Sequence, residues 1–196
     1  MIHTEPDPLA LFDEWFKEAE SSEPNDPNAM ALAVIDAEGR PSVRMVLLKG
    51  HDARGFEFFT NYESRKGQGL SAHPEAELCF YWKSLRKQIR ITGKVQRVTE
   101  AESDEYYASR PRGSRIGAWA SRQTRPMLDY ESLQSAVSDV EKRFEGVEDI
   151  PRPSHWGGFR LTPDRIEFWQ DQPFRLHKRF VYVKDGNGWT KEWLYP

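Results

Sequence analysis

Short apolar runs separated by turn-forming residues limit, more than any other feature, how this chain can fold. These runs are rich in β-branched and aromatic side chains, and Gly, Pro or Asp stands between them. Such a pattern is typical of strands joined by short connections. The candidate strands are 31–36, 42–48, 56–59, 76–82, 88–98, 158–161, 165–169, 180–183 and 189–194. The sequence therefore predicts a mainly antiparallel β fold, with hairpin turns at 37–40 and 185–188.

Helices are predicted between these strands. Asp7 and Pro8 form a good helix start, and the apolar residues from Leu9 to Phe16 fall largely on one helical face. Further helices are predicted at 66–72, after the capping-box spacing of 99–102, and at 130–144. A chain of 196 residues without a long linker fits one domain. We expect a single domain over 1–196, with a helix and linker in 1–28 and the last strands in 165–196.

The segment 110–125 holds five arginines and no carboxylate, although the net charge of the whole chain is −3. Arginine offers a planar fork of donors for phosphate or carboxylate, and small residues such as Gly113 and Gly117 let backbone N–H groups approach the same anion. A solvated basic loop is the alternative interpretation. Because the chain is acidic overall, we expect a local site for a small anion rather than a nucleic-acid surface.

Two further segments place cations among apolar or aromatic residues. Arg44 and Lys49 stand at the two ends of an apolar run. Arg65 and Lys66 follow a candidate strand and open a short candidate helix, so their cations and the free N–H groups of the helix could converge on a phosphate. The alternative is a solvated strand end.

Several other functions have little support in the sequence. The five histidines are scattered and no cysteine pair accompanies them, so no metal site is expected. No Gly-x-Ser-x-Gly elbow of a hydrolase occurs. The acidic start of the chain does not look like a signal peptide, and no apolar run approaches the roughly 20 residues of a membrane span. We therefore expect a cytoplasmic protein without a membrane partner.

The sequence resembles the flavin mononucleotide (FMN)-dependent pyridoxine (pyridoxamine) 5'-phosphate oxidases. The resemblance lies in the three basic segments and in residues 82–88, 155–159, 166–170 and 175–177. The resemblance covers nearly the whole chain from about Asp7. It implies a split β-barrel that forms a homodimer with FMN at the interface. It also implies oxidation of pyridoxamine 5'-phosphate or pyridoxine 5'-phosphate to pyridoxal 5'-phosphate, with O2 as the acceptor, H2O2 as a product and ammonia released from the amine. The alternatives are another flavin-dependent split-barrel reductase, a non-catalytic FMN- or pyridoxal-phosphate-binding protein, and a nucleic-acid binder.

The resemblance also implies which residues contact the cofactor. Arg65 and Lys66 match the residues that bind the flavin phosphate, and 44–49 match the segment along the flavin ring and ribityl chain. The complete set is Arg44, Met45, Val46, Leu47, Leu48, Lys49, Phe59, Thr60, Arg65, Lys66, Gln88, Gln123, Thr124, Trp169 and Arg179.

A second set matches the substrate-binding residues of the family, namely Lys49, Tyr106, Arg110, Ser114, Arg175 and His177. Two cations would neutralise a phosphate dianion while hydroxyls fix its orientation. Arg175 and His177 match catalytic residues that lie over the substrate ring. On an extended chain their alternation would point both side chains to the same face, although a lone histidine in a strand is more often structural.

The chain departs from the family pattern at three places. Lys178 stands where aspartate is usual, and Trp193 stands where arginine is usual. The printed sequence also begins close to the first helix, without the basic, tyrosine-containing extension that covers the substrate in longer members.

Overall fold

The computed structural model describes residues 6–186 and 188–196. The strands are β1 (Ala29–Ile35), β2 (Pro41–Leu47), β3 (Gly50–Asp52), β4 (Gly55–Asn61), β5 (Glu75–Trp82), β6 (Lys87–Arg97), β7 (Trp156–Gln170), β8 (Lys178–Asp185) and β9 (Gly188–Leu194). The helices are α1 (Pro8–Ser22), α2 (Arg65–Ala72), α3 (Glu100–Ser109), α4 (Arg112–Ala120) and α5 (Tyr130–Arg143), with a 3₁₀ turn η1 (Pro173–Arg175). All pairings between these strands are antiparallel, so the predicted fold class is confirmed.

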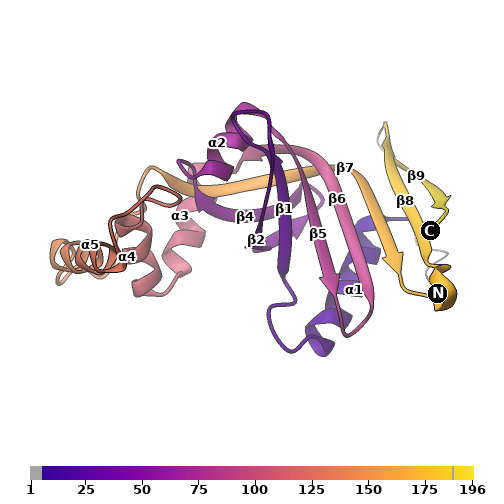
Figure 1. Cartoon of the computed structure of the whole chain (residues 1–196), viewed down its shortest axis with the longest axis horizontal. Helices are drawn as coiled ribbons and strands as arrows, with labels where there is room; N and C mark the ends of the chain where they lie inside the picture. The colour runs from indigo at the N-terminus through magenta and orange to yellow at the C-terminus, as the bar shows by residue number, and fades with distance from the viewer. Residues whose placement is uncertain (1–5, 187) are drawn as a thin grey trace.

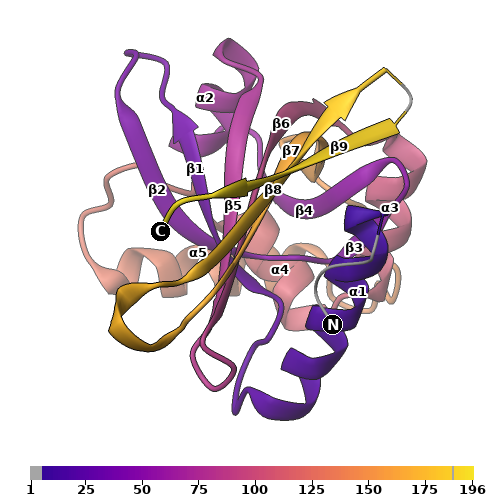
Figure 2. The same cartoon turned by 90° about the vertical axis from the view of Figure 1, so that its right-hand side faces the viewer.

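The long strand β7 connects the two parts of the sheet. The main order is β2-β1-β5-β6-β7-β4-β3, and β8 and β9 continue from β7 as a separate hairpin. The first half of β7 pairs with β4 and its second half pairs with β8, while β6 accompanies both halves. The sheet curls around the core and divides along β7 (Figures 1 and 2), which is the arrangement expected of a split barrel.

The sequence predicted two strands, 158–161 and 165–169, where the structure has one. The residues between them include Pro163, which we read as a break. Pro163 instead lies opposite Gly93, where the register of β6 and β7 shifts. Proline is tolerated at such an irregularity, and a Cβ at Gly93 would lie 2.0 Å from the carbonyl oxygen of Thr162. The glycine therefore allows the strand to continue.

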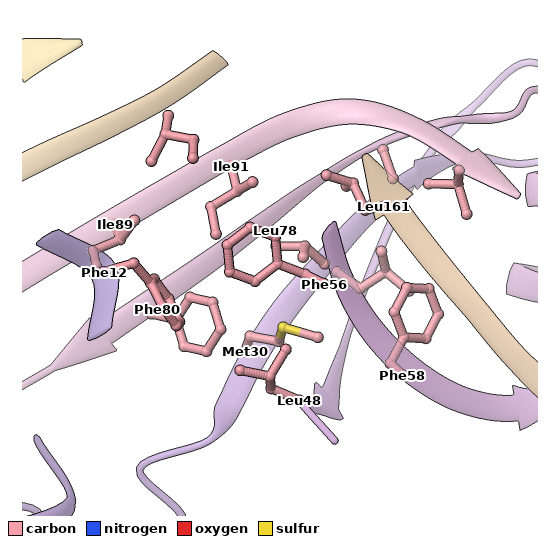
Figure 3. Packing of buried hydrophobic residues seen from close by; sticks show 14 of the residues in the cluster. Phe12, Met30, Leu48, Phe56, Phe58, Leu78, Phe80, Ile89, Ile91 and Leu161 are labelled. Atoms are coloured by element: carbon pink, nitrogen blue, oxygen red, sulfur yellow. The ribbon is translucent and has the colours of Figure 1, made fainter. Parts of the chain in front are cut away.

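Helix α1 packs its apolar face against the inside of the curved sheet. The Asp7 side chain caps the helix, as predicted, by accepting a hydrogen bond from the Leu9 N–H. The Phe12 ring meets the rings of Phe56 on β4 and Phe80 on β5 edge-on, at centroid distances of 4.9 and 5.4 Å. Figure 3 shows these side chains pointing into a common core. Full burial of each such side chain stabilises the fold by about 1.5–3 kcal/mol. This packing holds α1 against the curved sheet that carries the site.

Helices α3, α4 and α5 lie together at one end of the molecule (Figure 1). The predicted capping box is present at the start of α3, where Thr99 and Glu102 exchange hydrogen bonds. Residues 112–120, which we considered as a basic loop, form α4 instead. Ile116 on α4 packs with Phe144 and Ile150 in a small second core, so one apolar stripe is sufficient to fold this segment as a helix.

The hairpin of β8 and β9 lies at the opposite end and crosses in front of the sheet when viewed from that end (Figures 1 and 2). Its predicted turn includes residue 187, which lies outside the described residues, and the flanking Asp185 and Gly188 are paired. None of the helices in the described part of the chain is long and apolar enough to cross a membrane. The single-domain boundaries proposed from the sequence stay a prediction.

Candidate functional site

A hollow of about 800 Å³ lies between β2, β4, the start of α2, and helices α3 and α4. Most of the predicted site residues line it, namely Arg44, Met45, Val46, Leu47, Lys49, Phe59, Thr60, Arg65, Lys66, Tyr106, Arg110, Ser114, Gln123 and Thr124. Ser42, Val43, Pro111 and Trp156 also line it and were missed by the sequence analysis. Among the described residues, the lining includes five Arg or Lys side chains and no Asp or Glu. The hollow is therefore suited to anionic ligands.

Lys66 forms one corner of this hollow. Its side chain is only 8% exposed, and its Nζ donates hydrogen bonds to Gln123 Oε1 at 2.7 Å and to Ser64 Oγ at 3.2 Å. Burial and then the nearby charge of Arg44 lower the pKa of Lys66 to about 8. Both of these acceptors are neutral. An anion beside Lys66 would therefore stabilise the charged form of the ammonium group.

Arg65 stands beside Lys66 at the first position of α2. Its backbone N–H donates to Thr124 Oγ1 at 3.0 Å, which ties the loop carrying Gln123 to the start of the helix. Thr124 has a φ of 67°, a left-handed conformation that non-glycine residues rarely adopt. Strained backbone of this kind often occurs where a loop is held in place for function.

The Arg65 guanidinium is paired with Asp36, which the sequence analysis missed. Arg65 Nε donates to Asp36 Oδ2 at 3.2 Å, and the Asp36 side chain is fully buried. Its carboxylate also accepts hydrogen bonds from the N–H groups of Glu38 and Arg40 in the β1–β2 turn. The Arg40 N–H and then Arg65 lower the pKa of Asp36 to about 2. Asp36 stands next to the predicted turn at 37–40, where aspartate is common, but nothing in the sequence linked it to Arg65.

The other end of the hollow combines cations with stacked aromatic rings. Phe59 on β4 and Tyr106 on α3 stack at a centroid distance of 4.0 Å, and Lys49 Nζ lies 5.9 Å from the centre of the Tyr106 ring. Arg110 follows the last residue of α3, and its guanidinium carbon lies 4.5 Å from the centre of the Trp156 ring. Partial burial lowers the pKa of Arg110 from its ordinary value.

The remaining predicted residues lie elsewhere in the chain. Leu48 belongs to the core and is labelled there in Figure 3. Gln88, Trp169, Arg175, His177 and Arg179 lie around the ends of β6, β7 and β8 and not on the hollow. Figure 1 shows the turn between β7 and β8 at the opposite end of the molecule from α3 and α4. Within one chain, the predicted site is therefore divided into two separated sets.

This second set has its own internal order. The rings of Trp169 and His177 are 4.7 Å apart, and the Gln172 N–H donates to His177 Nδ1 at 3.2 Å. Asp171 Oδ1 lies 3.0 Å from the same nitrogen. Arg179 Nη2 donates to the buried Glu167 at 2.7 Å. These contacts hold His177 and Arg179 in fixed positions.

The expectation that Arg175 and His177 lie on an extended chain was wrong. Phe174 and Arg175 have φ values of 58° and 64°, so the chain forms the turn η1 before β8 begins at Lys178. Pro173 favours such a turn because its φ is fixed near −65°. Two successive left-handed residues leave Phe174 and Arg175 exposed at the molecular surface.

Comparison with known proteins connects these features to one family. The family profile described as "Pyridoxamine 5'-phosphate oxidase" matches residues 16–170, and that of the "Pyridoxine 5'-phosphate oxidase C-terminal dimerisation region" matches residues 156–196. The pyridoxine/pyridoxamine 5'-phosphate oxidase of Caulobacter vibrioides (strain NA1000 / CB15N) is 56% identical over 193 residues, covering 98% of this chain and 86% of that protein. The enzyme of the same name from Gluconobacter oxydans (strain 621H) is 56% identical over 196 residues, covering 100% and 98%.

A solved structure extends the comparison to three dimensions. PhzG from Burkholderia lata 383, in complex with tetrahydrophenazine-1-carboxylic acid, matches with a TM-score of 0.92 and 32% identity, covering 99% of this chain and 95% of that chain. The agreement in fold extends over both parts of the divided sheet. The family profile covers residues 16–170, and relatives that bear the oxidase name are 56% identical over nearly the whole chain. This chain therefore belongs to the pyridoxamine 5'-phosphate oxidase family.

Proposed function

We propose that this protein binds FMN and oxidises pyridoxamine 5'-phosphate and pyridoxine 5'-phosphate to pyridoxal 5'-phosphate, with O2 as the electron acceptor. The observation that carries this proposal is the pair of cation clusters in one hollow. One cluster, Arg65 and Lys66, lies at a helix N-terminus, and the other, Lys49 and Arg110, lies among aromatic rings. Two separate clusters suit two phosphate esters, one on the cofactor and one on the substrate.

The residues at the first cluster fit the phosphate of FMN. Lys66 is buried with only neutral hydrogen-bond partners, and the N-terminus of α2, where the Arg65 and Gly67 N–H groups donate to Thr124 and Ser64, adds partial positive charge. Thr60 and Gln123 are already hydrogen-bonded to each other at 3.2 Å and line the same wall. FMN bound there would supply the redox chemistry, accepting a hydride from the substrate and passing its electrons to O2.

The residues at the second cluster fit the phosphate of the substrate. The cations of Lys49 and Arg110 neutralise the dianion, and the hydroxyls of Tyr106 and Ser114 orient it. Anchoring the phosphate would hold the substrate ring at a fixed distance from the part of the hollow proposed to bind FMN. Such positioning contributes to the rate because a small displacement of the reacting carbon slows hydride transfer.

We further propose that a second copy of the chain completes the site. The match to the dimerisation region covers residues 156–196, which include Trp169, Arg175, His177 and Arg179. In a symmetric dimer, the set at the β7–β8 turn of one subunit can approach the hollow of the other. This arrangement would account for the exposure of Phe174 and Arg175 in the isolated chain.

The chemistry of the second set supports roles near the substrate ring. A guanidinium has hydrogen-bond donors and no acceptor, so Arg175 can donate to a ring oxygen but cannot accept the substrate's proton. His177 Nδ1 lies 3.2 Å from the Gln172 nitrogen and 3.0 Å from Asp171 Oδ1, so this side of the ring is engaged within the chain. His177 Nε2 is therefore the ring nitrogen that can form a hydrogen bond with the substrate and hold it in place.

The basic segment 110–125 gives little support to nucleic-acid binding. Arg110 faces the hollow, and Arg112 donates hydrogen bonds to the carbonyl oxygens of Phe144 and Val147. Two of the five arginines of this segment are therefore engaged by the hollow or by backbone carbonyls, which leaves fewer cations for nucleic-acid phosphates. The other rival is an oxidase for a ring carboxylate, since the PhzG structure contains such a ligand.

Anaerobic mixing of the FMN-loaded protein with each candidate substrate tests the proposed function. We expect pyridoxamine 5'-phosphate and pyridoxine 5'-phosphate to bleach the flavin absorbance, and pyridoxamine without its phosphate to act much more slowly. Tetrahydrophenazine-1-carboxylic acid is the matched comparison for the rival. Rapid bleaching by this carboxylate, without bleaching by either phosphorylated vitamer, would contradict the proposal.

The pH dependence of FMN binding should report the buried Lys66. Its pKa is about 8 in the free protein, and a phosphate beside the ammonium would favour the charged form and raise this pKa in the complex. Binding then takes up a proton at pH values between the two pKa values. FMN affinity should be steady from about pH 7 to about pH 8 and then fall by up to about tenfold per pH unit. Titrations of FMN fluorescence would measure it.

A Lys66→Arg variant is the matched control for this titration. Arginine stays charged throughout the range, so its FMN affinity should lose the decline above about pH 8. An identical decline in both proteins would assign the effect to another group.

A further inference from the structure

We propose that Trp156 is a positioning residue, whose ring holds the Arg110 guanidinium in place of a carboxylate, so that the full charge of Arg110 stays available to the substrate's phosphate. The inference rests on the proposed function, because the phosphate is that of the proposed substrate.

The contacts of Arg110 differ from those of two other arginines in the proposed site. Arg65 is paired with Asp36, and Arg179 is paired with Glu167. The Arg110 guanidinium instead lies over the Trp156 ring at 4.5 Å and farther from the Tyr107 ring at 5.8 Å. Among the described residues, the buried Nη1 of Arg110 has no hydrogen-bond partner, and no carboxylate lines the hollow. A buried donor without a partner is costly, so an acceptor from a ligand is expected there.

An aromatic ring and a carboxylate hold a guanidinium in different ways. A carboxylate takes two donors of the fork and cancels most of the charge. A ring attracts the cation through its electron-rich face but uses none of the in-plane N–H donors. A guanidinium held on a ring can therefore bind a phosphate with its whole fork, whereas one paired with a carboxylate can offer only its remaining donors.

The Trp156 ring is itself held firmly. Trp156 is 7% exposed and is paired with Asn61 of β4 at the start of β7. Its carbonyl oxygen accepts a hydrogen bond from Arg152 Nη1 at 2.6 Å. The Tyr107 ring packs against it edge-on at 5.2 Å, and the Tyr106 ring lies nearly parallel to it at 6.1 Å. The ring that lies against the Arg110 guanidinium is therefore held in one place by its neighbours.

The test measures binding of inorganic phosphate to FMN-loaded protein by calorimetry at constant ionic strength, so that the cofactor's own phosphate site is filled. Trp156→Leu should weaken phosphate binding by about tenfold, and Trp156→Phe, which keeps a smaller aromatic face, should weaken it by about two- to threefold. In an Arg110→Leu background, Trp156→Leu should change phosphate binding by less than about twofold, because the group that the ring positions is gone.

Three outcomes would overturn the inference. These are unchanged phosphate binding in Trp156→Leu, an equal loss in the Arg110→Leu background, or an equal loss in folded Trp156→Phe. If Trp156→Leu does not fold, Trp156→Phe still tests the inference, since unchanged phosphate binding in the single variant, or an equal loss in the Arg110→Leu background, would contradict it. The experiment needs no turnover. Failure to oxidise pyridoxamine 5'-phosphate would therefore refute the proposed function separately.

Discussion

Replacing Arg65 and Lys66 together by alanine is expected to weaken FMN binding by about 10²–10⁴-fold. Each cation would make a charge-assisted hydrogen bond with the cofactor phosphate, worth about 1.5–3 kcal/mol, and about 1.4 kcal/mol corresponds to a factor of ten. The two residues belong to one cluster, so their effects need not be additive. Quenching of FMN fluorescence on addition of the unloaded protein measures the affinity directly.

The control for this variant must account for Asp36, which loses a partner when Arg65 is removed. Arg40→Ala is matched, because Arg40 also lies near the Asp36 carboxylate, at 3.5 Å, but does not line the hollow. We expect Arg40→Ala to bind FMN normally. If it loses FMN as strongly as the double variant, the effect comes from the buried carboxylate and not from the proposed phosphate cluster.

Replacing Arg110 by glutamate is expected to lower kcat/KM for pyridoxamine 5'-phosphate by about 10³-fold while FMN binding is retained. The substitution removes the bidentate contact to the substrate's phosphate and places a carboxylate against a dianion. Arg65 and Lys66 are untouched and belong to the other cluster of the hollow. Steady-state kinetics and the flavin content of the purified protein test the two halves of this prediction.

Lys142→Glu makes the same change in net charge on an exposed face of α5 and should leave both quantities near wild type. An unchanged kcat/KM in Arg110→Glu would show that the substrate's phosphate binds elsewhere. A loss of FMN in Arg110→Glu would show that the two clusters are not separate.

Much of the fold could be predicted because it depends on local sequence patterns. The Asp7 cap, the capping box at Thr99 and the alternating strands each depend on residues close together in the chain. The continuity of β7 could not be predicted, because it depends on a glycine of β6 facing Pro163 across the sheet. Helix α4 was missed for a similar reason, because its apolar residue Ile116 is buried only through packing against Phe144 and Ile150, which are distant in the sequence.

The site followed the same division. The cations that line the hollow stand in the three basic segments of the sequence and were assigned to the site through the family resemblance, namely Arg44, Lys49, Arg65, Lys66 and Arg110. Asp36 and Trp156 were not found, because each acts through an arginine distant in sequence. The separation of Arg175 and His177 from the hollow could not be read from the sequence either, since it is a property of how β7 spans the molecule.

A mixture of two inactive variants most directly tests the claim that this oxidase builds each active site from two chains. Arg110→Glu damages the hollow, and Arg175→Leu damages the set at the β7–β8 turn. After subunit exchange in an equal mixture, the account predicts recovery of about a quarter of wild-type oxidation of pyridoxamine 5'-phosphate, because half of the dimers are mixed and each has one intact site. Activity that stays at the level of the separate variants, with exchange verified by mass spectrometry, would contradict it.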